Sequence, residues 1–380
     1  NDPPRLYVRY HKESENDPSM DDEARSYFKL IENGDEECVK LFNLFKEITL
    51  KEVEKIYDEL DIKFDSYAGE SFYNDKMQPV IDELAEKGLL VESEGAKIVD
   101  LEKYGMPPCI ILRSDGASLY ATRDLAAACY RKEHYDFDKC LYVVAYQQNL
   151  HFKQIFKVLE LMGKPWAKDL VHVAYGMVSL LDDNGNQVAM STRNGTVVLL
   201  EDVLKKCHEK CLEIIEQKNP DLEDKENVAR QVGTGAVIFG ALSNSKIKDI
   251  AFSYSKILNF DGETGPYVQY TAARIKSVLR KGGAIGKYEI KNVNEDEYQL
   301  IALLSTFPDV VKAAAERLEP FFVTRYAIDV ASAFNKFYFD CKIIGDDANE
   351  TNFRLAISSA TLTVLSSALT LLGIKVPERM

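Results

Sequence analysis

The sequence lacks the features of membrane and secreted proteins. No apolar run reaches the ~18–20 residues that span a bilayer, and the first residues contain neither the basic nor the apolar region of a secretory signal. The seven cysteines are scattered and odd in number, which favours reduced thiols and a cytoplasmic protein without membrane attachment. Because the chain begins at Asn1 and not at methionine, we interpret it as a fragment, a processed product or a trimmed chain.

The sequence also lacks a surplus of basic residues. Its net charge of −14 argues against a general nucleic-acid binder. Residues 1–100 carry about 26 acidic and about 13 basic groups, so the rest of the chain is close to neutral. RNA could be bound by this later part. For the acidic part, a charged face that only keeps the protein soluble remains the alternative.

No metal site is predicted. The nearest cluster of metal-binding residue types is Cys207-His208-x-x-Cys211, which could supply three ligands. It lies on a predicted amphipathic helix over 200–216 and lacks a second cysteine pair, so a structural role for these residues is favoured.

The most informative stretch is 114–124, S-D-G-A-S-L-Y-A-T-R-D. It predicts a turn, a short β-like run over 118–122 and then an Ala-rich helix with Asp124 in its first turn. Tyr120 and Asp124 would lie where a strand meets a helix N-terminus, the place where open α/β sheets bind ligands. A carboxylate there suits a guanidinium, which it receives through two parallel hydrogen bonds. A buried tyrosine and a helix-terminal carboxylate without a ligand are the alternative, which spacing alone favours.

The order of elements predicts a doubly wound α/β fold followed by a helical domain. Near-continuous apolar runs at 139–145 and 170–174 are typical of strands buried in a parallel sheet, and polar residues follow the first of them. Residues 5–60 are predicted to be mostly helical, and beyond a charged linker at 219–226 helices dominate again. Further strands are predicted at 62–64, 88–91, 96–100 and 109–112.

Two further segments suggest binding. The loop 190–196, M-S-T-R-N-G-T, contains a cation and hydroxyls just before a helix, an arrangement that can hold phosphates, although an ordinary surface loop is the commoner case. Tyr267, Tyr270 and Arg274 share one face of a predicted helix. Such a face can stack an unpaired RNA base, although core packing is the commoner role.

Five motifs in series resemble arginyl-tRNA synthetase, a class I aminoacyl-tRNA synthetase. L-Y-A-T-R-D, Y-Q-Q-N-L-H-F-K-Q and M-S-T-R-N-G-T-V-V-L-L-E-D-V-L resemble its catalytic domain. D-G-E-T-G-P-Y-V-Q-Y-T-A-A-R-I and the closing L-L-G-I-K-V-P-E-R-M resemble its helical anticodon-binding domain. The resemblance covers essentially the whole chain in family order.

The resemblance implies roles for particular residues. Tyr120 and Asp124 would contact the substrate arginine, with Asp124 receiving the guanidinium, and Gln148 would hold either its amino-acid end or its side chain. The adenine of ATP would lie against three consecutive residues, Gly176, Met177 and Val178.

The family's second ATP loop corresponds to Met190–Arg193. There Ser191 and Arg193 would support catalysis, since cations stabilise the triphosphate as pyrophosphate leaves, and Mg²⁺ would accompany ATP. Two positions depart from the family: Ala189 replaces the usual lysine and Asn194 stands where a second basic residue is common. Arg193 is therefore the one cation left in this loop sequence.

The resemblance also implies the tRNA contacts and the domain boundaries. Tyr270, Arg274 and the C-terminal Met380 would meet the anticodon loop of tRNA(Arg). Residues 1–218 would form part of the catalytic domain, with an insertion over 1–110 and the second half of a Rossmann-type nucleotide fold over 110–218. Residues 219–380 would form an α-helical anticodon-binding bundle.

The expected activity is ATP-dependent formation of arginyl-adenylate and transfer of arginine to its tRNA, by a monomer. None of the five histidines forms the H-x-G-H motif of class I enzymes, so we expect the first half of the nucleotide fold to be missing and the isolated chain to have little activity. Two alternatives stay open: an inactive tRNA-binding or interaction module, and a non-synthetase arginine binder.

Overall fold

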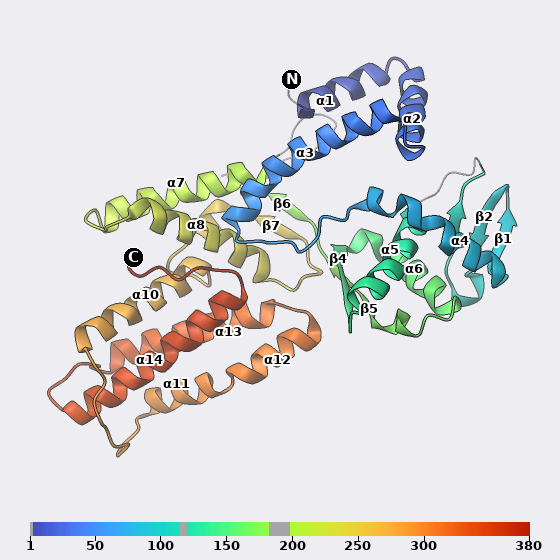
Figure 1. Ribbon diagram of the computed structural model, residues 1–380. Coiled ribbons are helices and arrows are strands. Elements are labelled where there is room, and N and C mark those ends of the chain that lie inside the picture. Colours follow the sequence, from blue (N-terminus) through green and yellow to red (C-terminus); the bar gives the residue numbers. More distant parts are fainter. Residues whose placement is uncertain (1–2, 115–119, 182–197) are drawn as a thin grey trace. The chain divides into compact units, whose positions relative to one another are not determined.

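The computed structural model describes residues 3–114, 120–181 and 198–380, and Figure 1 shows its elements. The chain divides into two compact units. One unit comprises residues 28–39 and 63–177, and the other comprises residues 1–27, 40–62 and 178–380. We describe each unit by itself.

Three helices form the N-terminal part of the chain, as predicted for residues 5–60. They are α1 (Pro3–Ser14), α2 (Ser19–Glu32) and α3 (Glu36–Glu59). Gly34, with a positive φ of 80°, lies in the turn between the last two. α3 has no buried residue along its 24 residues, although Ile56 near its end packs against a hydrophobic core.

The unit around residues 63–177 combines an antiparallel sheet with a parallel strand pair. Its strands are β1 (Leu90–Ser93), β2 (Ala96–Val99), β3 (Cys109–Leu112), β4 (Cys140–Ala145) and β5 (Leu170–Tyr175). β1, β2 and β3 pair antiparallel in that order, whereas β4 and β5 pair parallel. Its helices are α4 (Met77–Glu86), α5 (Tyr120–Tyr135) and α6 (Asn149–Leu161). Leu84, Ile111, Leu125 and Ile155 are fully buried in the shared core.

Two predicted strands are wrong. Residues 62–64 contain no strand. The β-like run predicted at 118–122 is also wrong, because Tyr120, Ala121 and Thr122 are helical in α5. Residues 118 and 119 lie outside the described residues. Alanine-rich sequence favours helix, and the Thr122 hydroxyl donates to the Ile111 carbonyl of β3 at 2.5 Å. Asp124 consequently lies one turn into α5 and not in its first turn.

The other unit begins with helices around a small parallel sheet. It contains β6 (Val178–Leu180), α7 (Leu200–Lys218), α8 (Lys225–Leu242), β7 (Ile250–Phe252) and α9 (Tyr254–Ile257). β6 and β7 pair parallel. α8 packs closely against α10 (Gly265–Gly282): a Cβ at Gly235 would lie 2.8 Å from the Gln269 amide, and one at Gly265 would lie 2.8 Å from the Phe239 Cβ. Glycine at these positions lets the helices approach.

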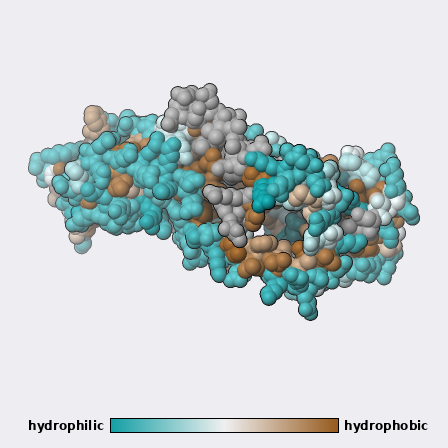
Figure 2. Space-filling view, turned by 90° about the horizontal axis from the view of Figure 1, so that it is seen from above, coloured by the Kyte–Doolittle hydropathy of each residue, from teal (hydrophilic) through white to brown (hydrophobic). Residues whose placement is uncertain are grey.

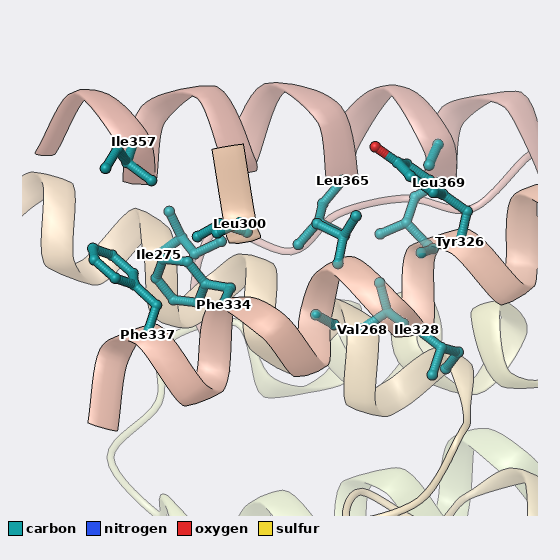
Figure 3. Packing of buried hydrophobic residues seen from close by; sticks show 14 of the residues in the cluster. Val268, Ile275, Leu300, Tyr326, Ile328, Phe334, Phe337, Ile357, Leu365 and Leu369 are labelled. Atoms are coloured by element: carbon teal, nitrogen blue, oxygen red, sulfur yellow. The ribbon is translucent and has the colours of Figure 1, made fainter. Parts of the chain in front are cut away.

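Five further helices complete this unit. They are α10 (Gly265–Gly282), α11 (Glu295–Ser305), α12 (Phe307–Arg317), α13 (Phe321–Asp340) and α14 (Ala348–Leu371). In Figure 3, Ile357, Leu365 and Leu369 face the side chains of the opposing helices. Pro320 precedes α13, and Gly373, with φ of 74°, follows α14.

α14 is long and apolar enough by composition to cross a membrane, although the sequence contains no uninterrupted apolar run of that length. In this structure α14 is a core helix, because its apolar side chains are buried in the helical core. The buried residues include Phe353, Leu355, Ile357, Leu365 and Leu369. The face of the molecule seen in Figure 2 is mostly hydrophilic with scattered hydrophobic patches.

Truncation of the α13 core is expected to be strongly destabilising. Phe334 is 0% exposed and packs among α10, α11 and α14 residues. Phe334→Ala should lower the free energy of unfolding by about 3–5 kcal/mol, because it leaves a cavity. Phe339→Ala, on the same helix but 88% exposed, is the matched control and should change it by less than about 0.5 kcal/mol. Urea denaturation of both variants measures the difference, and equal effects would contradict the observed packing.

Candidate functional site

The Asp124 carboxylate lies on a side of α5 that is not buried in the core. Its neighbours Arg123 and Leu125 are buried, whereas its own side chain is 33% exposed. Its Oδ2 lies 2.6 Å from Nε2 of His151, in the first turn of α6. Among the described residues no lysine or arginine pairs with this carboxylate, so no cationic side chain of those residues competes with a cationic ligand for it.

The parallel pair β4–β5 brings further predicted residues to the same sheet edge. Ala145 pairs with Tyr175 at the carboxyl ends of the two strands. Gln148 follows the first end in a short 3₁₀ helix, Tyr146–Gln148, and is exposed. Gly176, which is buried, and Met177, which is exposed, follow the second end. Such an edge is the usual ligand-binding edge of open α/β sheets.

The helix that carries Asp124 is anchored by polar contacts. The buried Arg123 donates from Nε to Oδ1 of Asn74 at 3.1 Å. About two turns further on, Arg131 lies over the rings of Tyr73 and Tyr142, at 5.7 and 5.5 Å from their centroids. Tyr120, the first described residue of α5, is 65% exposed. The structure therefore fixes the carboxylate firmly and leaves the Tyr120 ring open to solvent.

The predicted tRNA contacts meet in one concavity. Tyr270, Arg274 and Met380 line a pocket of about 700 Å³, although Met380 is more than a hundred residues from the other two in sequence. The pocket also contains the aromatic ring of Tyr338 and three further cations, Arg280, Lys281 and Arg379. Two acids, Asp221 and Glu223, also line it. Aromatic rings and guanidinium groups together suit an unpaired nucleotide.

Arg274 lies close to two tyrosine rings. Its guanidinium lies 4.8 Å from the centroid of Tyr270 and 5.3 Å from that of Tyr338. Its Nη1 donates to Oδ1 of Asn335 at 2.5 Å. The Asn335 amide in turn donates to the Tyr267 hydroxyl at 3.0 Å, so the guanidinium plane is fixed before any ligand binds.

The C-terminal tail is bound to the same helices. Lys276 of α10 pairs with Glu378 at 2.5 Å, and Arg280 donates to the Glu378 carbonyl at 3.1 Å. The Met380 carbonyl accepts from Asn219 at 3.5 Å, and its side chain packs on the α7–α8 core. These contacts explain how the last residue reaches the pocket.

The predicted ATP loop lies outside the described residues; it contains Ala189, Met190, Ser191, Arg193 and Asn194. Cys207 and Cys211 are buried on α7, where burial raises the pKa of each thiol to about 12, and burial lowers the pKa of His208. Neutral buried thiols pack as small apolar side chains.

Comparisons with known proteins define the family. The family described as tRNA synthetases class I (R), catalytic domain, matches residues 2–254, and the DALR anticodon binding domain matches residues 268–380. This pairing of a class I catalytic domain with a helical anticodon-binding domain defines a class I aminoacyl-tRNA synthetase. Within that class, the chain belongs to the arginyl-tRNA synthetase family.

Individual relatives agree with this assignment. The chain is 52% identical to the arginine–tRNA ligase of Clostridium beijerinckii and 53% identical to that of Halothermothrix orenii, in each case over 99% of this chain and 66% of the relative. It superimposes on the arginyl-tRNA synthetase of Thermus thermophilus with a TM-score of 0.86 and 26% identity, over 99% of this chain and 69% of that structure. The chain thus spans about two thirds of the length of its curated relatives.

These findings confirm the predicted family and fold class: a class I catalytic domain followed by a helical anticodon-binding domain. The assigned roles of individual residues and the boundary at residue 218 stay predictions. Sequence reasoning missed His151, Asn335 and Tyr338 as members of the two sites. For His151 a signal existed, because it lies three residues after Gln148 in the quoted Y-Q-Q-N-L-H motif.

Proposed function

We propose that this chain provides the arginine-binding and anticodon-binding parts of an arginine–tRNA ligase. The reaction is attack of the arginine carboxylate on the α-phosphate of ATP to give arginyl-adenylate, followed by transfer to a terminal ribose hydroxyl of tRNA(Arg). The observation that carries the proposal is the half-buried Asp124 carboxylate, held at 2.6 Å by a histidine and not neutralised by a lysine or arginine among the described residues.

Arginine recognition would rest on charge and planarity. A guanidinium presents parallel N–H groups that match the two oxygens of a carboxylate, which is the role of Asp124. The exposed ring of Tyr120, one turn earlier on α5, would cover the guanidinium face. Gln148, beyond the end of β4, would hold the amino-acid end or the side chain of arginine.

ATP would bind beside this site. Gly176, Met177 and Val178 would lie against the adenine, where a buried glycine following β5 permits close approach of a flat ring. Ser191 and Arg193, with Met190, would contact the phosphates. Mg²⁺ would be held largely by the ATP phosphates and water, as is usual for this ion. The protein's contribution is to position the reactants and stabilise charge.

The helical part would bind the tRNA. Tyr270, Arg274 and Met380 would contact the anticodon loop in the pocket described above, with Tyr338 as a second stacking surface. We further propose the boundary between catalytic and anticodon-binding parts near residue 218, at the end of α7. The seven free cysteines support a reducing, cytoplasmic location, and we propose that the protein acts as a monomer.

The isolated chain is expected to bind its substrates but not to activate arginine efficiently. Val143 of β4 is 65% exposed and Leu141 is also exposed, whereas parallel strands are normally covered on both faces. Further elements would therefore be needed to complete the nucleotide site. Arginine-dependent exchange of pyrophosphate into ATP measures activation, and the rate should be at least about 100-fold below that of a full-length relative.

The positive control for this assay is the full-length arginine–tRNA ligase of Clostridium beijerinckii. Circular dichroism shows whether the 380-residue chain is folded, and filter binding measures its binding of tRNA(Arg). Exchange by the chain at the rate of the control would contradict the expected incompleteness. Loss of both arginine and tRNA binding in a folded chain would contradict the proposed function itself.

A further inference from the structure

We propose that His151 is a positioning residue for arginine recognition: it fixes the Asp124 carboxylate in the orientation that receives the guanidinium. This inference rests on the proposed arginine site. It adds a residue that would not touch the substrate and acts through the carboxylate. Asp124 and His151 belong to different helices, 27 residues apart in sequence, so their contact also joins α5 to α6.

The geometry determines the proton arrangement of the pair. An ionised carboxylate only accepts hydrogen bonds, so the 2.6 Å contact requires that Nε2 of His151 carries the proton and donates to Oδ2. In a neutral ring Nδ1 is then unprotonated. The Asp124–His151 pair therefore specifies one of the two tautomers of the ring.

The histidine ring is itself held in place. Its centroid lies 5.3 Å from that of Phe152 in an edge-to-face arrangement. Phe152 is buried and packs against Tyr142 of β4 and His172 of β5, with centroid distances of 5.1 and 4.5 Å. Nε2 of His172 donates to the Val144 carbonyl at 2.9 Å. The donor on His151 is thus fixed relative to the parallel strand pair.

A fixed donor on one oxygen limits the rotation of the carboxylate. Among the described residues Oδ1 accepts no hydrogen bond, and Oδ2 retains a second lone pair, so both oxygens can still accept from a guanidinium. A carboxylate that is already oriented loses less conformational entropy when the ligand binds. His151 should therefore strengthen arginine binding without contacting arginine.

Calorimetric titration of the 380-residue chain with L-arginine tests the inference. His151→Ala should weaken binding about tenfold, because a hydrogen bond to a charged group is lost. His151→Gln, whose amide can present an N–H near the position of Nε2, should bind within about threefold of the unchanged chain. His134→Ala removes an exposed histidine of α5 and is the matched control. Equal affinities of His151→Ala and the unchanged chain would overturn the proposal.

A second measurement reports on the pair itself. In the ¹⁵N NMR spectrum, the His151 ring should be protonated on Nε2, and the Nε2 resonance should shift in Asp124→Ala but not in Glu133→Ala, a change on the same helix. A ring protonated on Nδ1 would overturn the inference while leaving the arginine site intact. If the pair is present but the folded chain does not bind arginine, the proposed arginine site fails, and the positioning role fails with it.

Discussion

Replacing Asp124 by asparagine should abolish most of the affinity for arginine. The substitution keeps the shape of the side chain but removes the negative charge and replaces one acceptor oxygen with a donor amide. Loss of a hydrogen-bonded charge partner costs about 2–3 kcal/mol, which corresponds to roughly 30- to 150-fold weaker binding. Calorimetry with L-arginine on the 380-residue chain measures the effect.

The control for this experiment lies on the same helix. Glu133 of α5 is exposed near its C-terminal end, so Glu133→Gln removes the same charge away from the site and should leave the affinity unchanged. Citrulline, which has the shape of arginine without its charge, should bind weakly to both proteins. Equal affinity of Asp124→Asn and the unchanged chain for arginine would remove the basis of the substrate assignment.

Replacing Arg274 by alanine should produce the largest loss of tRNA binding. The guanidinium lies near the rings of Tyr270 and Tyr338 and is oriented by Asn335, so its loss removes a planar cation and loosens two rings. Stacking contacts to a single base contribute about 1–3 kcal/mol, or roughly 5- to 150-fold in the dissociation constant for tRNA(Arg). Filter binding at fixed salt concentration measures it.

Two further variants separate charge from planarity. Arg274→Lys retains the positive charge but lacks the flat, stacking guanidinium, and it should recover only a small part of the affinity. Lys312→Ala removes an exposed cation of α12 that does not line the pocket and should have no effect. If Arg274→Ala and Lys312→Ala bind tRNA equally well, the pocket is not the anticodon contact.

Local sequence patterns correctly predicted the strands with the most continuous apolar sequence. The apolar runs at 139–145 and 170–174 are β4 and β5, and their near-continuous hydrophobicity correctly indicated parallel pairing. The strand at 109–112 matches β3. The prediction failed at Tyr120–Thr122, where an aromatic and a β-branched residue suggested a strand. Helix was favoured there because the following alanines propagate it and because α5 buries that face against β3.

The sequence by itself determined the family, the parallel strand pair β4–β5, the helical character of the later part, and the identity of the carboxylate and aromatic residues that the proposed sites use. These properties reside in short runs of neighbouring residues, whose spacing is set by the helix and strand repeats. Only the tertiary structure decided that His151 contacts Asp124 and that Met380 reaches Tyr270 and Arg274. Such contacts depend on how distant helices pack and on where the C-terminal tail is bound, and no local pattern encodes that packing.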